Sequence, residues 1–417
     1  NAPTVIRSYA LQRMDAMKQC WRWFGPEDPI GLSDLHQVGV EGIVTALHNI
    51  PPGETWDREA ISERQSVLHA DGYAWDVVES LPVSEAIKTQ TKRMADHIVA
   101  YKASLYALAA QDVKVVCYNF MPILDWTRTS LRAKQAHGGA AMLFDLVDFA
   151  VFDLHILERA AGVDDYPVDV LDAAQERFYE MSDSAKKTLQ NNITAGLPGA
   201  NDSWSVEDVR SLLETYMGIT PKRLRTNLID FLSEVAPVAQ SLGLRLCCHP
   251  DDPPFSLLGL PRVMSNSDDY AAVLAAVNLP ANGATLCTGS LGVAENFDGP
   301  AFVRRHGPRI HFAHLRNTTR IMGSDPNKPN FFEAAHLDGD TDMVGTVLAL
   351  LAEQKRRKAD GRIDWEIPMR PDHGQELLND LGGHSTPGYP LIGRMRGLAE
   401  LRGIMAAGTY NQGANLK

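Results

Sequence analysis

The chain has 417 residues, of which 44% are hydrophobic and 22% charged, and its formal net charge is −12. This composition is typical of a globular protein with a large buried core. The acidic balance excludes nucleic acid as the main partner, because phosphate binding requires clustered Lys and Arg. A small anionic substrate remains possible, since a few local cations are enough to bind it.

The cysteines are scattered, mostly in apolar segments, and their number is odd: Cys20, Cys117, Cys247, Cys248 and Cys287. Their spacing does not fit a disulfide framework, which indicates a reducing compartment. The sequence shows neither a signal peptide nor an apolar run long enough to span a membrane. We therefore expect a cytoplasmic protein that does not act on membranes.

Eight short apolar segments predict β-strands in chain order. They are residues 20–24, 42–47, 73–80, 113–120, 244–249, 284–288, 310–315 and 367–372. Most of them are apolar throughout rather than alternating, as expected for strands buried on both faces. Such strands separated by helices predict a parallel sheet.

The sequence predicts three helices between these strands. Thr220-Pro221 is a cap followed by proline at the first helical position, and Gly243 ends the apolar helical pattern that follows. Two more helices are expected over residues 88–110 and 341–358. Eight strand–helix units favour a (β/α)₈ barrel, and the absence of a Gly-x-Gly-x-x-Gly motif after the first strand weakens a dinucleotide-binding fold.

Residues 124–217, between the fourth and fifth strands, interrupt the regular alternation of strands and helices. A connection of this length must carry structure of its own. Residues 181–190 are helix-prone, residues 191–204 favour a loop, and Ser205 with Asp208 predicts a capping box. We expect one barrel over residues 1–417, with a helical insertion at the catalytic face that acts as a cap, a lid or an oligomer contact.

Residue types that bind metals stand where four consecutive strands end: His249, Cys287, His314 and Asp372. Active sites of such barrels lie at the C-terminal ends of the strands, so these side chains should meet. Two imidazoles, a thiolate and a carboxylate suit a divalent transition ion. Taken singly, Cys287 would be a buried core residue, but four such residues on adjacent strand ends favour a metal site. Cys248 should face the other way, since neighbours on a strand alternate.

Two residues near these ligands are candidates for acid–base chemistry. His373 follows Asp372 directly, and Tyr389 lies in a glycine-rich segment between Gly388 and Pro390. The alternatives are a solvated loop histidine and an aromatic packing residue. His384, in the same segment, has the same ambiguity.

Several polar or aromatic residues at strand ends are candidates for substrate binding. Arg316, Asn317 and Arg370 adjoin expected ligands, and the arginines could hold a carboxylate through paired hydrogen bonds. Salt bridges with nearby Asp or Glu are the alternative, above all for Arg320. The other candidates are Trp23, His48, Glu79 and Asn119.

Six motifs, in order from the first strand to the eighth, resemble the mannonate dehydratase family. They are WRWFG (21–25), VTALHNIP (44–51), VCYNFMP (116–122), CHPDDPP (248–254), HLRN (314–317) and MRPDHG (369–374). The resemblance covers nearly the whole chain, apart from the insertion.

The resemblance implies a xylose-isomerase-like barrel that dehydrates D-mannonate to 2-keto-3-deoxy-D-gluconate in bacterial hexuronate breakdown. It implies Mn²⁺ or Fe²⁺ held by His249, Cys287, His314 and Asp372. It also implies catalytic roles for His373 and Tyr389, with the choice of base and acid left open. The expected partner is a small aldonate, and we expect a homo-oligomer.

Other functions are compatible with parts of this pattern. A metal-dependent sugar isomerase or epimerase would use the same ligands with a base on each face of the substrate. A non-catalytic sugar-acid-binding barrel would not need His373 and Tyr389. A metallophosphoesterase is disfavoured because the pattern lacks the extra carboxylates and histidines of a multi-metal cluster.

Overall fold

A computed structural model describes residues 16–195, 204–323, 325–382 and 385–414. Within them, eight parallel strands close into a barrel in the spatial order β1-β12-β9-β8-β7-β4-β3-β2. The predicted (β/α)₈ barrel is confirmed, and each predicted strand overlaps one of the barrel strands. These are β1 (Lys18–Arg22), β2 (Gly42–Thr45), β3 (Trp75–Glu79), β4 (Val115–Tyr118), β7 (Arg245–Cys248), β8 (Asn282–Cys287), β9 (Ile310–Leu315) and β12 (Pro368–Pro371).

Burial on both faces explains why these strands are apolar without alternating. On β3, Val77 belongs to a small cluster inside the barrel, whereas Val78 packs in the larger core beneath the helices. Cys117 on β4 and Cys247 on β7 also belong to the inner cluster. Cys248 packs in the outer core, which confirms that it faces away from the barrel interior.

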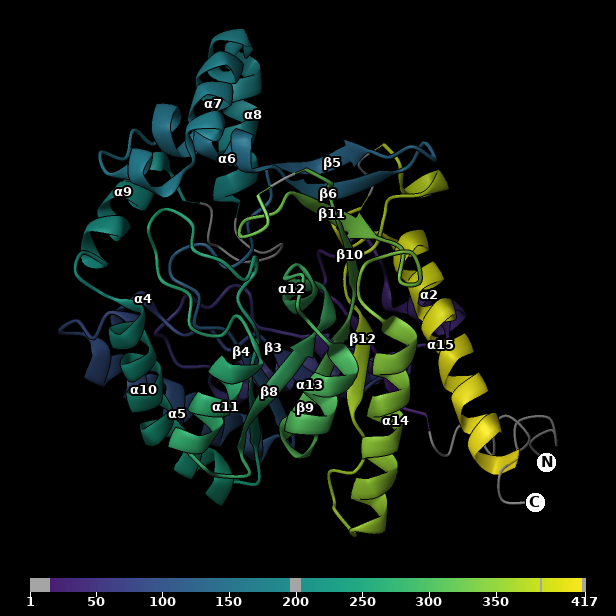
Figure 1. The fold of residues 1–417 in the computed structure, drawn as a ribbon. Coiled ribbons are helices and arrows are strands. Elements are labelled where there is room, and N and C mark those ends of the chain that lie inside the picture. The colour runs from purple at the N-terminus through teal and green to yellow at the C-terminus, as the bar shows by residue number, and fades with distance from the viewer. Residues whose placement is uncertain (1–15, 196–203, 324, 383–384, 415–417) are drawn as a thin grey trace.

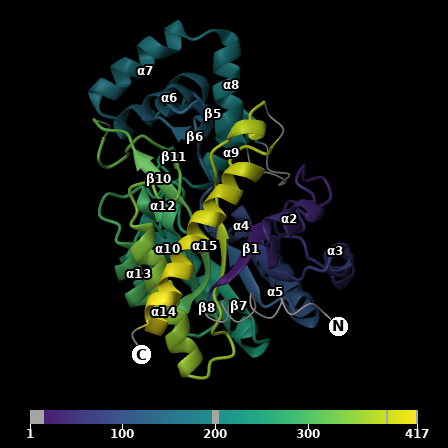
Figure 2. The ribbon, with the colours of Figure 1, turned by 90° about the vertical axis from the view of Figure 1, so that its right-hand side faces the viewer.

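Helices cover the outside of the barrel (Figure 1 and Figure 2). They are α2 (Leu32–Val38), α3 (Arg58–Ala70), α4 (Glu85–Lys88), α5 (Met94–Ala110), α10 (Pro221–Ser241), α11 (Ser267–Ala276), α13 (Gly299–His306), α14 (Met343–Ala359) and α15 (Leu391–Ala414). Three short helical turns lie in the connections: α12 (Thr288–Gly292), η3 (Gly307–Arg309) and η4 (Leu378–Asp380).

Helix α10 begins and ends where the sequence predicts. The side chain of Thr220 accepts a hydrogen bond from the N–H of Arg223, and Pro221 stands in the first turn, where its missing N–H costs nothing. Gly243 follows with a left-handed φ of 69°, which glycine adopts without steric cost. Helix α14 also agrees with its prediction.

The helix predicted over residues 88–110 is divided in two. Helix α4 ends at Lys88 and α5 begins at Met94. Between them Gln90 has a φ of 53°, a left-handed conformation that a continuous helix does not permit. The intervening sequence has neither Gly nor Pro to signal the break.

The insertion between β4 and β7 contains several helices, of which only the last two correspond to segments predicted as helical from the sequence. The helices are α6 (Leu146–Val151), η1 (Phe152–Ile156), η2 (Gly162–Asp165), α7 (Val168–Glu180), α8 (Asp183–Thr194) and α9 (Val206–Thr215). The predicted capping box opens α9: the N–H of Asp208 donates to Ser205 Oγ, and the Asp208 carboxylate accepts from the N–H of Ser205. Helices α7 and α8 stand at the top of both views (Figure 1 and Figure 2).

The insertion also contains two strands that the sequence analysis did not predict, so its description as helical is incomplete. Strands β5 (Ser130–Lys134) and β6 (Ala140–Phe144) form a hairpin. This hairpin joins β11 (Phe331–Ala334) and β10 (Asn317–Arg320) in an antiparallel sheet of order β10-β11-β6-β5. The partner of β6 lies far along the chain, and such non-local pairing leaves little local signal.

This second sheet lies at the end of the barrel where the strands finish (Figure 1). Strand β10 follows β9 almost directly. Arg128, just before β5, lies 3.0 Å from Asp252, which follows β7. The insertion therefore starts at the same end of the barrel as the predicted metal ligands. None of the helices in the described ranges is long and apolar enough to cross a membrane.

Candidate active site

The predicted metal ligands lie together at the C-terminal end of the barrel. One ligand atom from each of His249, Cys287 and His314 lies within 4.8 Å of the other two. Oδ2 of Asp372 lies 3.7 Å from Cys287 Sγ and 3.9 Å from His314 Nδ1. The strand register brings them together, because Cys287 on β8 is paired with His314 on β9. Parallel strands thus align ligands that are far apart in the sequence.

Each of the two imidazoles has one nitrogen beside a fixed protein oxygen. His249 Nδ1 lies 2.7 Å from the carbonyl oxygen of Pro250, and His314 Nε2 lies 3.3 Å from Glu79 Oε2. The other two nitrogens are 3.1 Å apart. Burial lowers the pKa of His249, which favours the neutral form that a metal requires. Carbonyl and carboxylate oxygens orient metal-binding histidines in this way.

The sulfur of Cys287 is held by the turn that follows it. Ser290 donates to Sγ from its N–H at 3.5 Å and from its hydroxyl at 3.2 Å. With the two imidazoles and the Asp372 carboxylate, the donor set combines nitrogen, sulfur and oxygen. This set fits a divalent transition ion.

Arg370 is engaged by two carboxylates at this centre. It donates to both oxygens of Glu79, at 2.9 and 2.7 Å, and to Asp372. Burial alone would raise the pKa of Glu79 and Asp372, but Arg370 and other nearby cations outweigh it, and both pKa values lie well below the ordinary range. Both groups are therefore carboxylates, and Glu79 contacts the ligand His314.

Arg316 is also surrounded by carboxylates. Its Nη1 lies 2.9 Å from Asp252 and 3.3 Å from Asp372, and its Nε lies 3.3 Å from Glu333. Arg128 contacts two of the same groups, Asp252 at 3.0 Å and Glu333 at 2.8 Å. These side chains are all buried, and their mutual pairing offsets the cost of removing the charges from water.

His373 and Tyr389 face each other beside the ligands. Nε2 of His373 lies 3.2 Å from the Tyr389 hydroxyl, and Nδ1 lies 3.1 Å from Glu333 Oε1. Nδ1 also lies 3.2 Å from Arg316 Nη1. Glu333 can only accept a hydrogen bond and the guanidinium can only donate one, so a proton on Nδ1 suits the first contact and a lone pair on Nδ1 suits the second. Burial, followed by the charge of Asp372, raises the pKa of Tyr389. Tyr389 is therefore held as a neutral phenol.

A small cavity lies between His373, Tyr389 and two of the predicted ligands, His249 and Asp372, and its volume is about 30 Å³. It brings together most of the residues that the sequence analysis selected. Its lining includes Glu79, Asn119, His249, Arg316, Arg370, Asp372, His373 and Tyr389.

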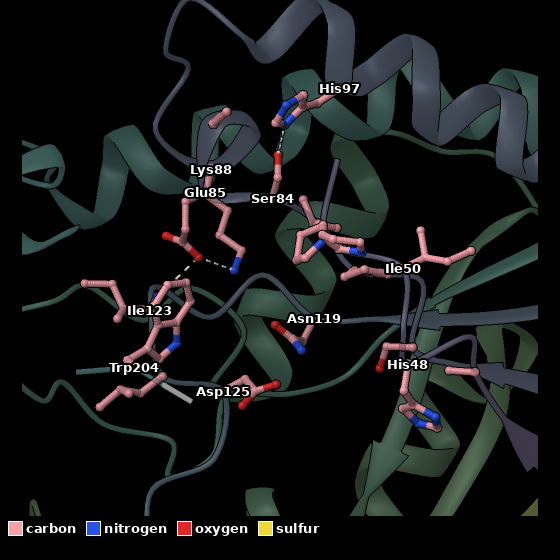
Figure 3. A pocket seen from close by; sticks show the side chains of 18 of the residues that line it. His48, Ile50, Ser84, Glu85, Lys88, His97, Asn119, Ile123, Asp125 and Trp204 are labelled. Atoms are coloured by element: carbon pink, nitrogen blue, oxygen red, sulfur yellow. Dashed lines mark hydrogen bonds and ion pairs between the residues drawn. The ribbon is translucent and has the colours of Figure 1, made fainter. Parts of the chain in front are cut away.

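A larger cavity of about 330 Å³ adjoins the small one. The two share Ser80, Asn119 and Asp125 in their linings. The predicted residue His48 lines the larger cavity, and Figure 3 shows Asn119 and Asp125 toward its middle. Of the predicted substrate-binding residues, His48 and Asn119 are thus the two that border this space.

Trp23 and Asn317 do not line either cavity. Trp23 is buried, with the guanidinium of Arg64 5.5 Å from the centre of its ring. Asn317 donates to the carbonyl oxygens of His336 and Thr341 and accepts from the N–H of Thr341. The side-chain amide of Asn317 is therefore hydrogen-bonded to backbone groups. Their assignment as substrate-binding residues gains no support from these positions.

Arg320 forms a salt bridge at 3.3 Å with Asp340, which matches the structural alternative given for it. His384 lies outside the described residues. Three residues of the site were not selected from the sequence: Arg128, Asp252 and Glu333. A signal existed for two of them, because Asp252 lies in the CHPDDPP motif and Glu333 is a lone charge in an apolar segment.

The comparisons with known proteins agree with this geometry. Residues 17–414 match the family model of D-mannonate dehydratase (UxuA). The chain is 52% identical over 391 residues to a mannonate dehydratase of Rhizobium meliloti (strain 1021), covering 94% of this chain and 97% of that protein. It is 53% identical over 388 residues to mannonate dehydratase 1 of Agrobacterium fabrum, covering 93% and 96%.

A solved structure is also similar along nearly its whole length. The mannonate dehydratase of Streptococcus suis serotype 2 has a TM-score of 0.73 and 28% sequence identity to this chain, and the match covers 95% of each. Both the fold and the sequence are thus shared with mannonate dehydratases.

The closed barrel and the ligand cluster at its C-terminal end define a metal-dependent TIM-barrel enzyme. The chain belongs to the D-mannonate dehydratase family. It is therefore a hydro-lyase that dehydrates D-mannonate, which confirms the activity predicted from the motifs.

Proposed function

We propose that this chain forms 2-keto-3-deoxy-D-gluconate from D-mannonate with Mn²⁺ or Fe²⁺ bound by His249, Cys287, His314 and Asp372. The main support is that His249 and Asp372 line one cavity with the pair His373–Tyr389, while Cys287 and His314 lie within reach of both. When bound, the ion supplies a Lewis acid that stabilises the negative charge developing on the substrate.

The reaction requires two proton movements from the protein. The C2 proton of the substrate is weakly acidic because it lies α to the carboxylate, and a base must remove it. The C3 hydroxyl departs as water once an acid gives it a proton. The resulting enol then becomes the 2-keto acid as C3 gains a proton and the C2 hydroxyl loses one.

His373 is the proposed base. In this proposal Nδ1 carries a proton directed at Glu333, so that Nε2 carries a lone pair. Arg316 Nη1, which also lies near Nδ1, then donates to Asp252 and Asp372 instead. Nε2 points into the cavity toward the Tyr389 hydroxyl. Glu333 acts through His373 by fixing its tautomer and ring orientation, so we propose it as a positioning residue.

Tyr389 is the proposed acid. Its raised pKa keeps the proton on the phenol, ready to be donated to the departing C3 hydroxyl. Arg316 and Arg370 hold Asp372 in place and keep it charged. In this proposal the two arginines serve the ligand set, rather than only the substrate carboxylate as their sequence positions suggested.

Removal of the metal tests the ligand assignment. Protein stripped with a chelator should lose D-mannonate dehydration and regain it with Mn²⁺ or Fe²⁺. Metal analysis should find about one ion per chain, and Cys287→Ser should bind the ion more weakly and shift preference toward harder ions, because a soft sulfur ligand is replaced by oxygen. Full activity of the metal-free protein would contradict the proposal.

The assay should follow the product as well as substrate loss. A 2-keto-3-deoxy acid indicates the lyase, whereas an isomerase or epimerase would give an isomer of the substrate without loss of water. The homo-oligomeric state and the cytoplasmic location expected from the sequence stay predictions.

A further inference from the structure

We propose that the cavity of about 330 Å³ binds the uncharged C4–C6 end of the aldonate and selects against substrates with a second anionic group at C6. This inference rests on the proposed function of the adjoining metal cavity, because it places the reacting carbons there. It assigns a subsite and a substrate class: monocarboxylic aldonates with a neutral polyol tail.

Space is the first argument. The cavity at the metal ligands has a volume of about 30 Å³, which is room for about two water molecules. A six-carbon acid does not fit there in full. The larger cavity shares Ser80, Asn119 and Asp125 with it, so a chain that reacts at C2 and C3 can extend past these residues.

Hydrogen-bonding groups suited to hydroxyls line the larger cavity. The Lys88 ammonium donates to Glu85 Oε1 and to the carbonyl oxygen of Met121, both at 2.7 Å. An ammonium has three N–H donors, so one is left for a ligand. Figure 3 shows the Lys88 amine, Asn119 and Asp125 directed toward the same space. Together they offer donors and acceptors, which is what a polyol needs.

The charges around this cavity are balanced. Lys88 is paired with Glu85 and Arg22 with Glu79, each at 2.7 Å. Burial, followed by the charges of Arg22 and Arg64, lowers the pKa of His48 to about 3, so His48 is neutral at physiological pH. Each of these cations therefore already has a carboxylate partner, and the donors left over, such as Arg22 Nε, can serve hydroxyls. A second carboxylate or phosphate on the substrate would have to compete with Glu79 and Glu85 for the cations, and it would meet the negative charge of Asp125 in the same lining.

Apolar side chains also line this cavity. Ile50 follows β2, Ile123 follows β4, and Trp204 and Leu212 come from the insertion. Their surfaces suit the C–H groups of a polyol chain, and an indole ring suits them best. The insertion thus contributes directly to the proposed subsite.

A substrate panel on the metal-loaded wild-type enzyme tests the charge argument. D-mannonate is compared with D-mannarate, which carries a carboxylate at C6. We expect kcat/KM for D-mannarate to be lower by at least about tenfold, a difference of about 1.4 kcal/mol. Equal kcat/KM values for the two acids would overturn the selection against a second anion.

A cavity-filling variant tests the location of the tail. Ala86 lines the larger cavity from α4, and Ala86→Phe should raise KM for D-mannonate about tenfold with little change in kcat. The inhibition constant of L-erythronate, which has the same C2 and C3 configuration but no C5–C6 end, should stay within about twofold of wild type. The matched control Ala173→Phe, on α7 and outside the cavity lining, should leave both constants unchanged.

The outcomes separate the two proposals. If the wild-type enzyme with Mn²⁺ or Fe²⁺ does not dehydrate D-mannonate, the proposed function itself fails. If it does, but Ala86→Phe leaves KM unchanged or weakens L-erythronate and D-mannonate equally, the tail does not lie in this cavity. Circular dichroism of Ala86→Phe confirms that the variant is folded before its kinetics are interpreted.

Discussion

Tyr389 owes its position to contacts on several sides of its ring. Phe24 packs edge-on at 4.8 Å between ring centres, and the Arg394 guanidinium lies 5.3 Å from the ring centre. Arg394 also donates to the Tyr389 carbonyl oxygen at 3.0 Å. The ring is thus fixed by packing, and the hydroxyl is left to face His373. The ring atoms that pack are therefore separate from the hydroxyl that we propose as the acid.

This separation makes Tyr389→Phe a sharp test of the acid. The ring contacts remain, and only the proton donor is lost. Positioned acids contribute about 10²–10⁴-fold to rate, so kcat should fall by about that factor while metal content stays at one ion per chain. The control Tyr106→Phe changes an exposed tyrosine on α5 and should behave as wild type. Near-normal turnover by Tyr389→Phe would assign the residue to packing alone.

At the scale of elements, one side chain joins three segments that are remote in sequence. Arg128 precedes β5, Asp252 follows β7, and Glu333 lies in β11. The guanidinium of Arg128 contacts both carboxylates and lies over the ring of Phe331 at 4.8 Å. The start of the insertion is therefore held to the barrel and to the second sheet by a buried ionic contact.

Arg128→Met should loosen this junction. The variant removes one of the cations that Asp252 and Glu333 share and leaves Arg316 as their main partner, and breaking a buried pair costs about 3–5 kcal/mol. We expect a Tm lower by several degrees in scanning calorimetry, together with reduced kcat because Glu333 is no longer fixed. The matched control is Arg177→Met in the same insertion, whose pair with Asp148 is partly exposed and should contribute about 1 kcal/mol or less. Equal Tm values for the two variants would contradict the role of Arg128.

At the scale of the whole molecule, the barrel buries a histidine far from the site. His311, near the start of β9, is 3% exposed, and its Nε2 lies 3.0 Å from the carbonyl oxygen of Pro280. Burial, followed by the charges of Arg245 and Arg357, lowers its pKa from 6.5 to about 3. The folded protein therefore keeps His311 neutral at pH values where the unfolded chain protonates it.

The sign of the effect on stability follows from linkage. Because the folded pKa is below the unfolded one, the contribution of His311 is fully present above about pH 6.5 and declines as the pH falls toward 3. The variant His311→Gln keeps an N–H for Pro280 but cannot titrate, so its Tm should fall less than that of wild type between pH 7 and pH 4.5. His69→Gln, at an exposed position on α3, should retain the wild-type slope. An unchanged slope in His311→Gln would show that other groups set the acid sensitivity.

The sequence by itself determined the barrel and the ligand types at its C-terminal end. Its strands are apolar segments separated by segments with helical periodicity, and both patterns can be recognised within a short stretch of sequence. His249, Cys287, His314 and Asp372 could be selected because each stands at a strand end, and parallel strands bring such ends to one face of a barrel. The same rule selected His373, one residue beyond Asp372.

Only the tertiary structure decided how the charges around these ligands are shared. Glu333 meets Arg128 across 205 positions of sequence, and the pairing of β6 with β11 also joins segments that are remote in sequence. Arg370 adjoins the ligands in sequence, yet its partner Glu79 lies 291 positions away. Asn317 was selected for the same adjacency, but its amide is used by backbone groups. Adjacency shows which residues are near a strand end, whereas the fold decides which atoms they contact, because buried charges and amides pair with whatever partner the packing brings within reach.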